Sequence, residues 1–161
     1  MSNATHAEVA AALSGRDKHL QTYLRSGGAD GHIVDVRGIG GHQLTTTLLV
    51  ETFGRKSGQR RVVPVLYGLF AGEAVIVASK GGADQHPDWY LNIISRPGIA
   101  FQIGGQAFRG EWRELEGEER VRIWDFMLTV HPPFVRYQAS TQRQIPLLML
   151  KPLEPIEIFK E

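Results

Sequence analysis

The stretch that decides the fold class is TTTLLVETFGRKSGQRRVVPVLYGLFAGEAVIVAS, from Thr45 to Ser79. β-branched residues, which favour strands, are concentrated in three parts of it: residues 45–52, 61–70 and 73–79. A glycine-containing loop separates the first two parts, and Ala71-Gly72 between the last two is short enough to be a hairpin turn. The stretch therefore predicts three strands, each antiparallel to the next.

The same kind of pattern continues toward the C-terminus. Further strands are predicted at residues 99–103, 106–115, 145–151 and 156–159. The turn between the first two is the clearest, because the paired glycines Gly104-Gly105 accept the positive φ of a two-residue turn. Two helices interrupt the strands, a short one after Pro87 and one from about Glu118 to Val130. Short antiparallel strands with few peripheral helices predict a mainly β, α+β fold, in which a barrel closes the edges of its own sheet.

Residues 1–30 are predicted to form a helical N-terminal extension to a domain of residues 31–161. Thr5 and Glu8 have the spacing of a capping box. A broken apolar stripe at roughly helical intervals follows at Val9, Leu13, Leu20 and Leu24. The helix either packs on the domain or lies on an anionic membrane surface. Basic residues available for the second alternative are Arg16, Lys18 and Arg25.

The composition excludes several classes of protein. The 161 residues, 42% of them hydrophobic, are enough for one domain with a packed core. The absence of cysteine excludes disulfides, thiolate zinc sites, iron–sulfur clusters and a cysteine nucleophile. The six histidines lack metal-binding spacings, so no metal is expected. A chain without cysteine fits a reducing compartment, and we expect a cytoplasmic location, with or without attachment to a membrane.

The charge is unevenly distributed. The net charge is +1, yet residues 52–72 contain no Asp or Glu and include Arg55, Lys56, Arg60 and Arg61. A nucleic-acid-binding protein spreads positive charge over a face or a helix, whereas here it is confined to one short loop. The pattern favours a small anionic ligand and argues against a nucleic-acid partner.

Two glycine-containing loops are candidate binding sites. Residues 54–61 combine two glycines with basic side chains, which suits binding of phosphate or carboxylate, although the loop could equally be a solvated hairpin tip. Residues 78–82 leave a strand and lead toward a helix that starts near Pro87, so they could present amide groups to a ligand or form a simple turn. Neighbouring strands could direct both loops at one ligand.

Aromatic residues form two further candidate features. Trp89 and Asn92 fall on the short predicted helix, where they could pack in the core or reach a ligand. The segment 131–138, with His, Phe and Tyr after a proline pair, could form a pocket wall or a hydrophobic plug.

Three motifs together resemble the deazaflavin-dependent nitroreductase family. They are T-F-G-R-K-S-G-Q-R-R-V-V-P from Thr52, A-S-K-G-G-A-D-Q-H-P-D-W-Y-L-N from Ala78 and I-P-L-L-M-L-K-P from Ile145. The resemblance implies a split β-barrel related to the flavin-mononucleotide-binding oxidoreductases. It also implies hydride transfer from reduced coenzyme F-420 to an organic acceptor: an activated alkene or enone, a quinone or a nitro-aromatic compound. Two alternatives stay open, an enzyme that uses flavin mononucleotide and a non-catalytic module that binds a deazaflavin. The chain is expected to be a monomer or a homodimer.

The resemblance assigns the cofactor site to two groups of residues. The phosphate and glutamate tail of F-420 would be held by Arg55, Lys56, Ser57, Gln59 and Arg61. The deazaflavin ring and its ribityl chain would be lined by Val62, Val63, Pro64, Val65, Leu66, Ala78, Ser79, Lys80 and Gly81, with Trp89 and Asn92 nearby. Arg60 stands where the family usually has proline, which is expected to add charge and loosen the loop.

The resemblance also implies an acceptor site. The family commonly has three tyrosines along the segment that contains residues 131–137, and here His131 and Phe134 replace two of them. His131, Phe134 and Tyr137 are therefore predicted to contact the substrate. Tyr137 and His131 are predicted as catalytic residues that supply a proton, with His131 titrating near neutral pH.

Overall fold

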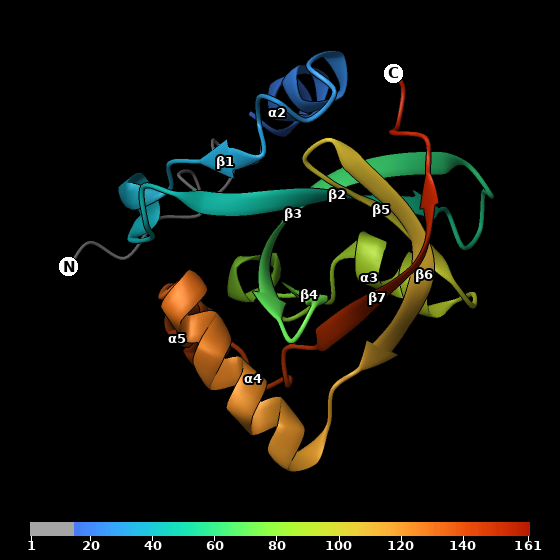
Figure 1. Cartoon of the computed structure of the whole chain (residues 1–161). Coiled ribbons are helices and arrows are strands. Elements are labelled where there is room, and N and C mark those ends of the chain that lie inside the picture. Colours follow the sequence, from blue (N-terminus) through green and yellow to red (C-terminus); the bar gives the residue numbers. More distant parts are fainter. Residues whose placement is uncertain (1–14) are drawn as a thin grey trace.

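The fold is a closed barrel of six antiparallel strands, and the computed structural model describes residues 15–161 of the chain. The strands follow the order β2-β3-β4-β7-β6-β5, with β5 returning to β2 (Figure 1). The short β1 pairs with Thr45 and Thr46 at the start of β2, on the edge opposite β3. Their bounds are β1 Ile33–Val34, β2 Thr45–Phe53, β3 Arg60–Phe70, β4 Glu73–Val77, β5 Ile99–Ile103, β6 Gln106–Glu114 and β7 Leu147–Ile156. The predicted mainly β split barrel is confirmed. The predicted capping box at Thr5 and Glu8 lies outside the described residues.

The barrel interior is filled by alternate residues of its strands. Because successive side chains of a strand point to opposite faces, Leu48 and Val50 of β2 turn inward together with Ile76 of β4, and all three are fully buried. Phe101 of β5 and Leu150 of β7 close this core. The interior is therefore a packed apolar core.

The last strand differs from the prediction. Residues 145–151 and 156–159 were predicted as a strand pair, which is wrong, because β7 runs without interruption from Leu147 to Ile156. Its prolines Pro152 and Pro155 lie beyond Leu150, where β7 pairs with β6 and no longer with β4. A proline lacks the N–H that a second neighbour would need, so it is tolerated on the side of a strand without a partner.

In the described residues, four α-helices surround the barrel. They are α2 Arg16–Arg25, α3 Asp88–Ile94, α4 Gly117–Val130 and α5 Phe134–Ala139. The helix predicted near residues 118–130 is α4, which covers the sheet with the buried Ile123 and Met127. Gly68 of β3 permits this close approach, since a Cβ there would lie 2.9 Å from the Met127 sulfur. The helix α5 was not predicted.

The helix α2 packs on the barrel. Tyr23 is fully buried, and its hydroxyl donates to the Thr47 carbonyl and accepts from the Gly104 amide, both at 2.9 Å. Leu20 and Leu24 pack against the same cluster. For residues 16–25 the packing alternative is therefore right. The boundary of an extension at residue 30 stays a prediction.

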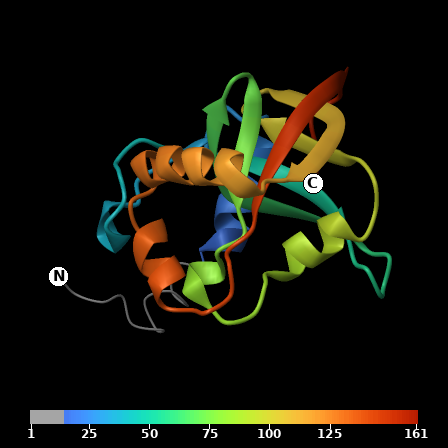
Figure 2. The same ribbon diagram turned by 90° about the horizontal axis from the view of Figure 1, so that it is seen from below.

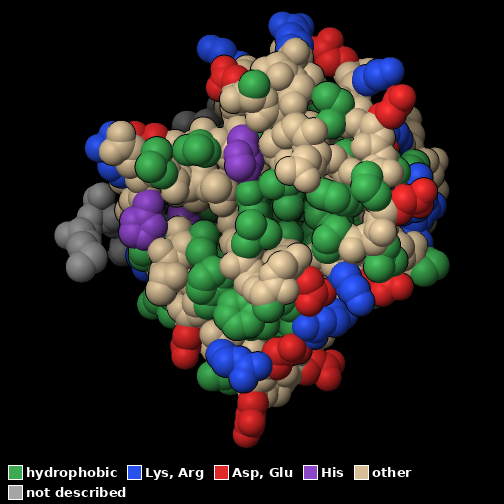
Figure 3. Space-filling model, in the orientation of Figure 1, with side chains coloured by type: hydrophobic (Ala, Val, Ile, Leu, Met, Phe, Trp, Pro, Cys, Tyr) green, Lys and Arg blue, Asp and Glu red, His purple; other side chains and the backbone are tan. Residues whose placement is uncertain are grey.

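The surface seen in Figure 3 is apolar in its middle and charged around its rim. Leu69 of β3 and Leu153 of β7 are both more than half exposed. Within residues 15–161, no helix has the length and hydropathy needed to cross a membrane.

Candidate functional site

A cavity of about 840 Å³ lies against the free edge of β3. β3 pairs with β4 only from Tyr67 to Phe70, so residues 61–66 have a strand partner on the β2 side alone. Side chains from both faces of this edge line the cavity: Val63 and Val65 belong to the inner face, and Leu66 to the outer. The open edge explains how consecutive residues of one strand line a single cavity.

The structure brings most of the predicted site residues to this cavity. Those that line it are Arg55, Lys56, Ser57, Arg61, Val63, Pro64, Val65, Leu66, Ser79, Lys80, Gly81, Trp89, Asn92, His131, Phe134 and Tyr137. They come from the β2–β3 loop, from β3, from the loop after β4, from α3 and from the α4–α5 region. α5, the loop after β4 and α3 follow one another in both views, and Figure 2 shows them along one side of the molecule (Figures 1 and 2). The roles of these residues stay predictions.

Three predicted cofactor residues do not line the cavity. Val62 faces the opposite side of β3 from Val63 and packs against the cluster that contains Leu49. Ala78 is fully buried in the barrel core. Gln59 is exposed at the end of the β2–β3 loop, where its carbonyl accepts from the Gly54 amide. Contact of these three side chains with a ligand in the cavity is not supported.

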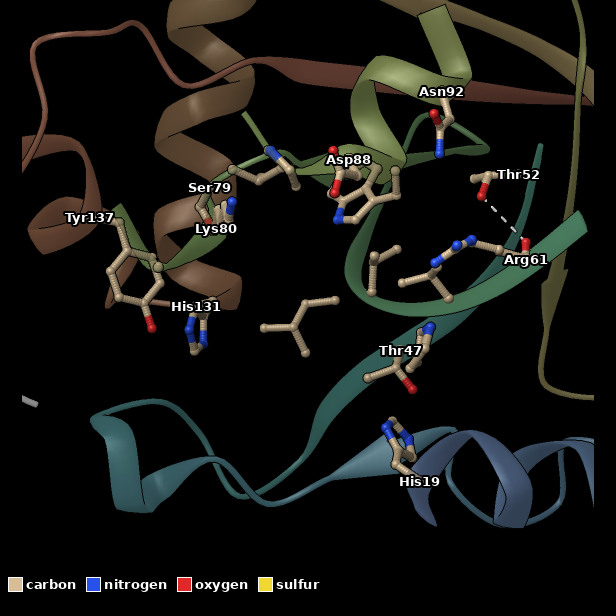
Figure 4. Close-up of a pocket in the computed structure, with 18 of the residues that line it drawn as sticks. His19, Thr47, Thr52, Arg61, Ser79, Lys80, Asp88, Asn92, His131 and Tyr137 are labelled. Carbon is tan, nitrogen blue, oxygen red and sulfur yellow. Dashed lines mark hydrogen bonds between the residues drawn. The ribbon is translucent and has the colours of Figure 1, made fainter. Parts of the chain in front are cut away.

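Other lining residues were not predicted. They are Gly15, His19, Val34, Val36, Ile39, Thr47, Thr52, Gly54, Val77, Pro87 and Asp88. His19 projects from α2 below Thr47 of β2 (Figure 4), and its Nε2 lies 2.6 Å from the Gly31 carbonyl. Thr47 ends a run of three threonines at the start of a predicted strand, and this polar run is a sequence signal for a site. The sequence contains no comparable signal for His19.

The β2–β3 loop forms the cationic end of the cavity. The Arg55 backbone N–H and Nη1 both donate to Oδ1 of Asn92, at 3.1 and 2.9 Å, and its Nη2 lies 3.3 Å from Asp88. Lys56, Arg61 and Lys80 also line the cavity, and none of them is in an ion pair within residues 15–161. Lys56 and Arg61 are therefore free cations at one end of this space, whereas Lys80 lies on the loop that contacts α5, nearer to Tyr137 (Figure 4).

Arg60 departs from its expected role. Its Nε donates to Glu51 at 2.6 Å, and its guanidinium lies 5.7 Å from the centre of the Phe159 ring. The charge that Arg60 adds is paired across β2 and β3 and does not line the cavity, so it is directed at the sheet and not at a ligand there. The expected loosening of the loop stays a prediction.

The other end of the cavity is aromatic. The ring of His131 lies 4.9 Å from that of Phe134 and 6.0 Å from that of Tyr137, measured between ring centres. Figure 4 shows His131 and Tyr137 at one end, with Arg61, Thr52 and Asn92 at the other. Burial raises the pKa of Tyr137, so its phenol keeps its proton.

His131 is 1% exposed, and its Nδ1 has no hydrogen-bond partner among the described residues. Burial, followed by the charges of Arg136 and His42, lowers the pKa of His131 to about 4. The expectation that His131 titrates near neutral pH is therefore wrong. The neutral ring can hold a hydrogen bond but cannot act as a cationic acid at pH 6 to 8.

The described part of the chain contains no group of three His, Asp or Glu side chains that could hold a metal ion. The cavity is lined by cations, by the Asp88 carboxylate, and by hydroxyl, amide, imidazole and aromatic groups. Such a set can bind and orient a ligand that is anionic at one end and flat at the other.

The strands and the cavity define a split-barrel protein with a ligand-sized cavity at a free strand edge, and comparison with known proteins gives the family. The model of the F-420H(2)-dependent quinone reductase family matches residues 18–152. The chain therefore belongs to that family and is an oxidoreductase. The resemblance based on the three sequence motifs is confirmed.

Individual relatives agree with this assignment. A Mycobacterium tuberculosis protein provisionally named as an F-420H(2)-dependent quinone reductase is 33% identical, over 71% of this chain and 97% of its own length. A solved structure of an F-420H(2)-dependent reductase is 39% identical, with a TM-score of 0.60 over 65% of this chain and 93% of that one. A second solved structure, described as a domain-swapped dimer, is 34% identical with a TM-score of 0.63 and covers 84% of this chain and 96% of its own.

Proposed function

We propose that the cavity binds reduced coenzyme F-420 and that the protein transfers a hydride from it to a quinone. Activated alkenes, enones and nitro-aromatic compounds are further acceptors under the same proposal. The observation that carries it is that two cations without an ion pair in residues 15–161, Lys56 and Arg61, and an aromatic cluster lie at opposite ends of one cavity (Figure 4). The cofactor has the matching distribution, with a phosphodiester and several carboxylates at one end and a flat ring system at the other.

The residues present fit that cofactor. Lys56 and Arg61 would hold the anionic end, since ammonium and guanidinium groups form charge-assisted bonds with phosphate and carboxylate. Val63, Val65 and Trp89 offer apolar surface beside them for the ring. A volume of about 840 Å³ falls in the range of pockets that enclose organic ligands.

The protein contributes binding, orientation and exclusion of water. Reduced F-420 supplies the hydride when it is bound. Val65, Leu66 and Phe134 keep the reaction space apolar, which strengthens the polar contacts made there. The phenol of Tyr137, protonated because burial raises its pKa, would donate a hydrogen bond to an acceptor oxygen and supply the proton that accompanies the hydride.

The test is a titration followed by turnover. Fluorescence titration of the purified protein with F-420, and separately with flavin mononucleotide, should show tighter binding of F-420. A quinone added to the complex with reduced F-420 should then reoxidise the cofactor. Preference for flavin mononucleotide would contradict the choice of cofactor. Cofactor that binds but is never reoxidised by any acceptor would contradict the proposed reaction.

A further inference from the structure

The loop between β4 and α3, residues 78–87, has a backbone that needs support. Ser79 has right-handed helical dihedral angles, whereas Lys80, Gly81 and Gly82 have φ of +47°, +63° and +85°. A non-glycine residue such as Lys80 adopts positive φ only where its surroundings hold it there. Because Ser79, Lys80 and Gly81 line the cavity, whatever holds this loop also shapes the binding site.

Arg143 binds both sides of the positive-φ turn. Its Nη1 and Nη2 donate to the carbonyls of Ala78 and Ser79, at 3.2 and 2.7 Å, on the side before the turn. Its Nε donates to the Ala83 carbonyl at 2.7 Å on the side after it. Nη1 also lies 3.0 Å from Nδ1 of His86. Only a planar guanidinium has enough donors, in a fixed arrangement, to hold these partners together.

Arg143 is itself held in position. Nε2 of Gln138 donates to its carbonyl at 2.8 Å, and Oε1 of Gln138 accepts from the Ile145 amide at 3.0 Å. None of the ion pairs within residues 15–161 includes Arg143. Its hydrogen bonds are therefore directed at the loop.

These bonds orient the amide groups of the loop. In a trans peptide the N–H points away from the C=O, so the amides of Ser79 and Lys80 face away from the guanidinium that binds the preceding carbonyls. A right-handed residue followed by a left-handed one, as in Ser79-Lys80, gathers successive N–H groups into a concavity that binds anionic or carbonyl oxygens. Arg143 is on the far side of this concavity and does not line the cavity.

We propose that Arg143 is a positioning residue of the cofactor site: its guanidinium holds the loop of residues 78–87 so that the amides of Ser79, Lys80 and Gly81 are presented to the cofactor. The inference rests on the proposed binding of F-420 in this cavity. Arg143 acts through the loop and touches neither cofactor nor substrate.

The test compares Arg143→Lys and Arg143→Ala with Arg113→Ala. Arg113 is a suitable control because it also makes side-chain bonds, to Glu119 at 2.6 and 3.0 Å, but does not line the cavity. The first measurement is hydrogen exchange of residues 79–83 in the cofactor-free protein, together with the melting temperature. The second is the dissociation constant of F-420, measured with and without millimolar guanidinium.

Arg143→Ala should speed exchange in residues 79–83 specifically and raise the F-420 dissociation constant about tenfold or more, the effect expected for losing charge-assisted hydrogen bonds. Added guanidinium should restore part of the affinity. Arg143→Lys should restore little, because an ammonium cannot span both sides of the turn. Arg113→Ala should leave unchanged both the hydrogen exchange of residues 79–83 and the dissociation constant of F-420.

Wild-type exchange and affinity in both Arg143 variants would overturn the inference. So would a loss of affinity that merely follows a lowered melting temperature, without a local change in exchange. If the wild-type protein does not bind F-420, the proposed function fails. If residues 79–83 exchange normally in Arg143→Ala while wild type binds F-420, the positioning role fails alone.

Discussion

Arg60 and Arg61 are adjacent in the sequence, but their side chains have different surroundings. Arg60 pairs with Glu51, whereas Arg61 lines the cavity, and the Thr52 hydroxyl donates to the Arg61 carbonyl at 3.4 Å (Figure 4). Successive side chains along β3 point to opposite faces of the sheet. The charge of Arg60 therefore forms an ion pair on the sheet, whereas the charge of Arg61 faces the cavity.

This difference gives the first prediction. Arg61→Ala and Lys56→Ala should each weaken F-420 binding by about 1–3 kcal/mol, the scale for losing a charged hydrogen bond. Arg60→Ala removes the same charge and should change affinity much less. The losses should shrink at high salt, because exposed charges are screened. Fluorescence titration at low and high salt measures all three, and equal losses for Arg60→Ala and Arg61→Ala would place the anion site elsewhere.

The second prediction concerns the buried His131. The unfolded chain binds a proton at this residue below its ordinary pKa of 6.5, whereas the folded protein binds it only below about 4. Neutral His131 therefore makes its full contribution to the free energy of unfolding above pH 6.5. This contribution is lost as the pH falls toward 4, and the free energy of unfolding decreases by about 3 kcal/mol.

Urea denaturation at pH 7 and pH 4.5 should show a smaller loss of stability in His131→Phe than in wild type, since the substitution removes the titrating group. Phe134→Leu is the control, because it disturbs the same aromatic cluster without removing a titrating group. An identical loss in His131→Phe and wild type would mean that other groups account for the acid sensitivity.

At the scale of elements, the β2–β4 strands and the short helix after Pro87 were predictable because each carries its signal within itself. β-branched residues define β2, β3 and β4, and the glycine loops lie next to them in sequence. The predicted cofactor residues come mostly from these contiguous motifs, which is why most of them reach the cavity.

What could not be predicted depends on contacts between distant segments. The bonds from Arg143 to the loop after β4 join residues about 60 positions apart, and His19 reaches the cavity only because α2 packs on the barrel. The alternation of side chains along β3 indicates two faces of the strand, but it does not show that residues 61–66 form a free edge. The predicted separation of residues 145–151 from 156–159 is absent, because beyond Leu150 β7 pairs with β6 alone and Pro152 and Pro155 are tolerated there.

The third prediction concerns the packing of the loop after β4 against α5. Gly82 has φ +85°, and a Cβ there would overlap the Ser140 hydroxyl and approach the Tyr137 carbonyl to 2.7 Å. Gly72 has a nearly equal φ of +81°, but a Cβ added at Gly72 would have no other residue's atoms within 4 Å. Gly72→Ala therefore carries the backbone strain alone, while Gly82→Ala adds the clash.

Gly82→Ala should destabilise the protein by about 1–3 kcal/mol more than Gly72→Ala, the range for overpacking. It should also weaken F-420 binding, because Ser79, Lys80 and Gly81 move with Gly82. Denaturation midpoints and fluorescence titration measure the two effects. Equal behaviour of the two variants would show that the loop shifts away from α5 without consequence.

At the scale of the whole molecule, α2 contributes residues both to the packed core and to the wall of the cavity. Tyr23 is buried against β2 and the β5–β6 turn, while Gly15 and His19 line the cavity. Gly28 lies so close to that turn that a Cβ would overlap the Gly104 carbonyl. The helix is thus part of the packed molecule, and Arg25, one of the basic residues offered for membrane contact, pairs with Glu161 at 2.6 Å.

The fourth prediction follows from this packing. Tyr23→Ala removes a fully buried ring and should cost about 3–5 kcal/mol. Tyr23→Phe keeps the ring and should cost about 1–3 kcal/mol, because the Gly104 amide and the Thr47 carbonyl lose their partner. Deletion of residues 1–28 should destabilise the protein at least as much as Tyr23→Ala, as measured by urea denaturation.

A deletion variant that stays as stable as wild type, keeps its affinity for F-420 and loses only its binding to anionic vesicles would instead support the membrane-surface alternative. That outcome would require the barrel to bury β2 and the β5–β6 turn without Tyr23, and the two hydrogen bonds of its hydroxyl make this unfavourable.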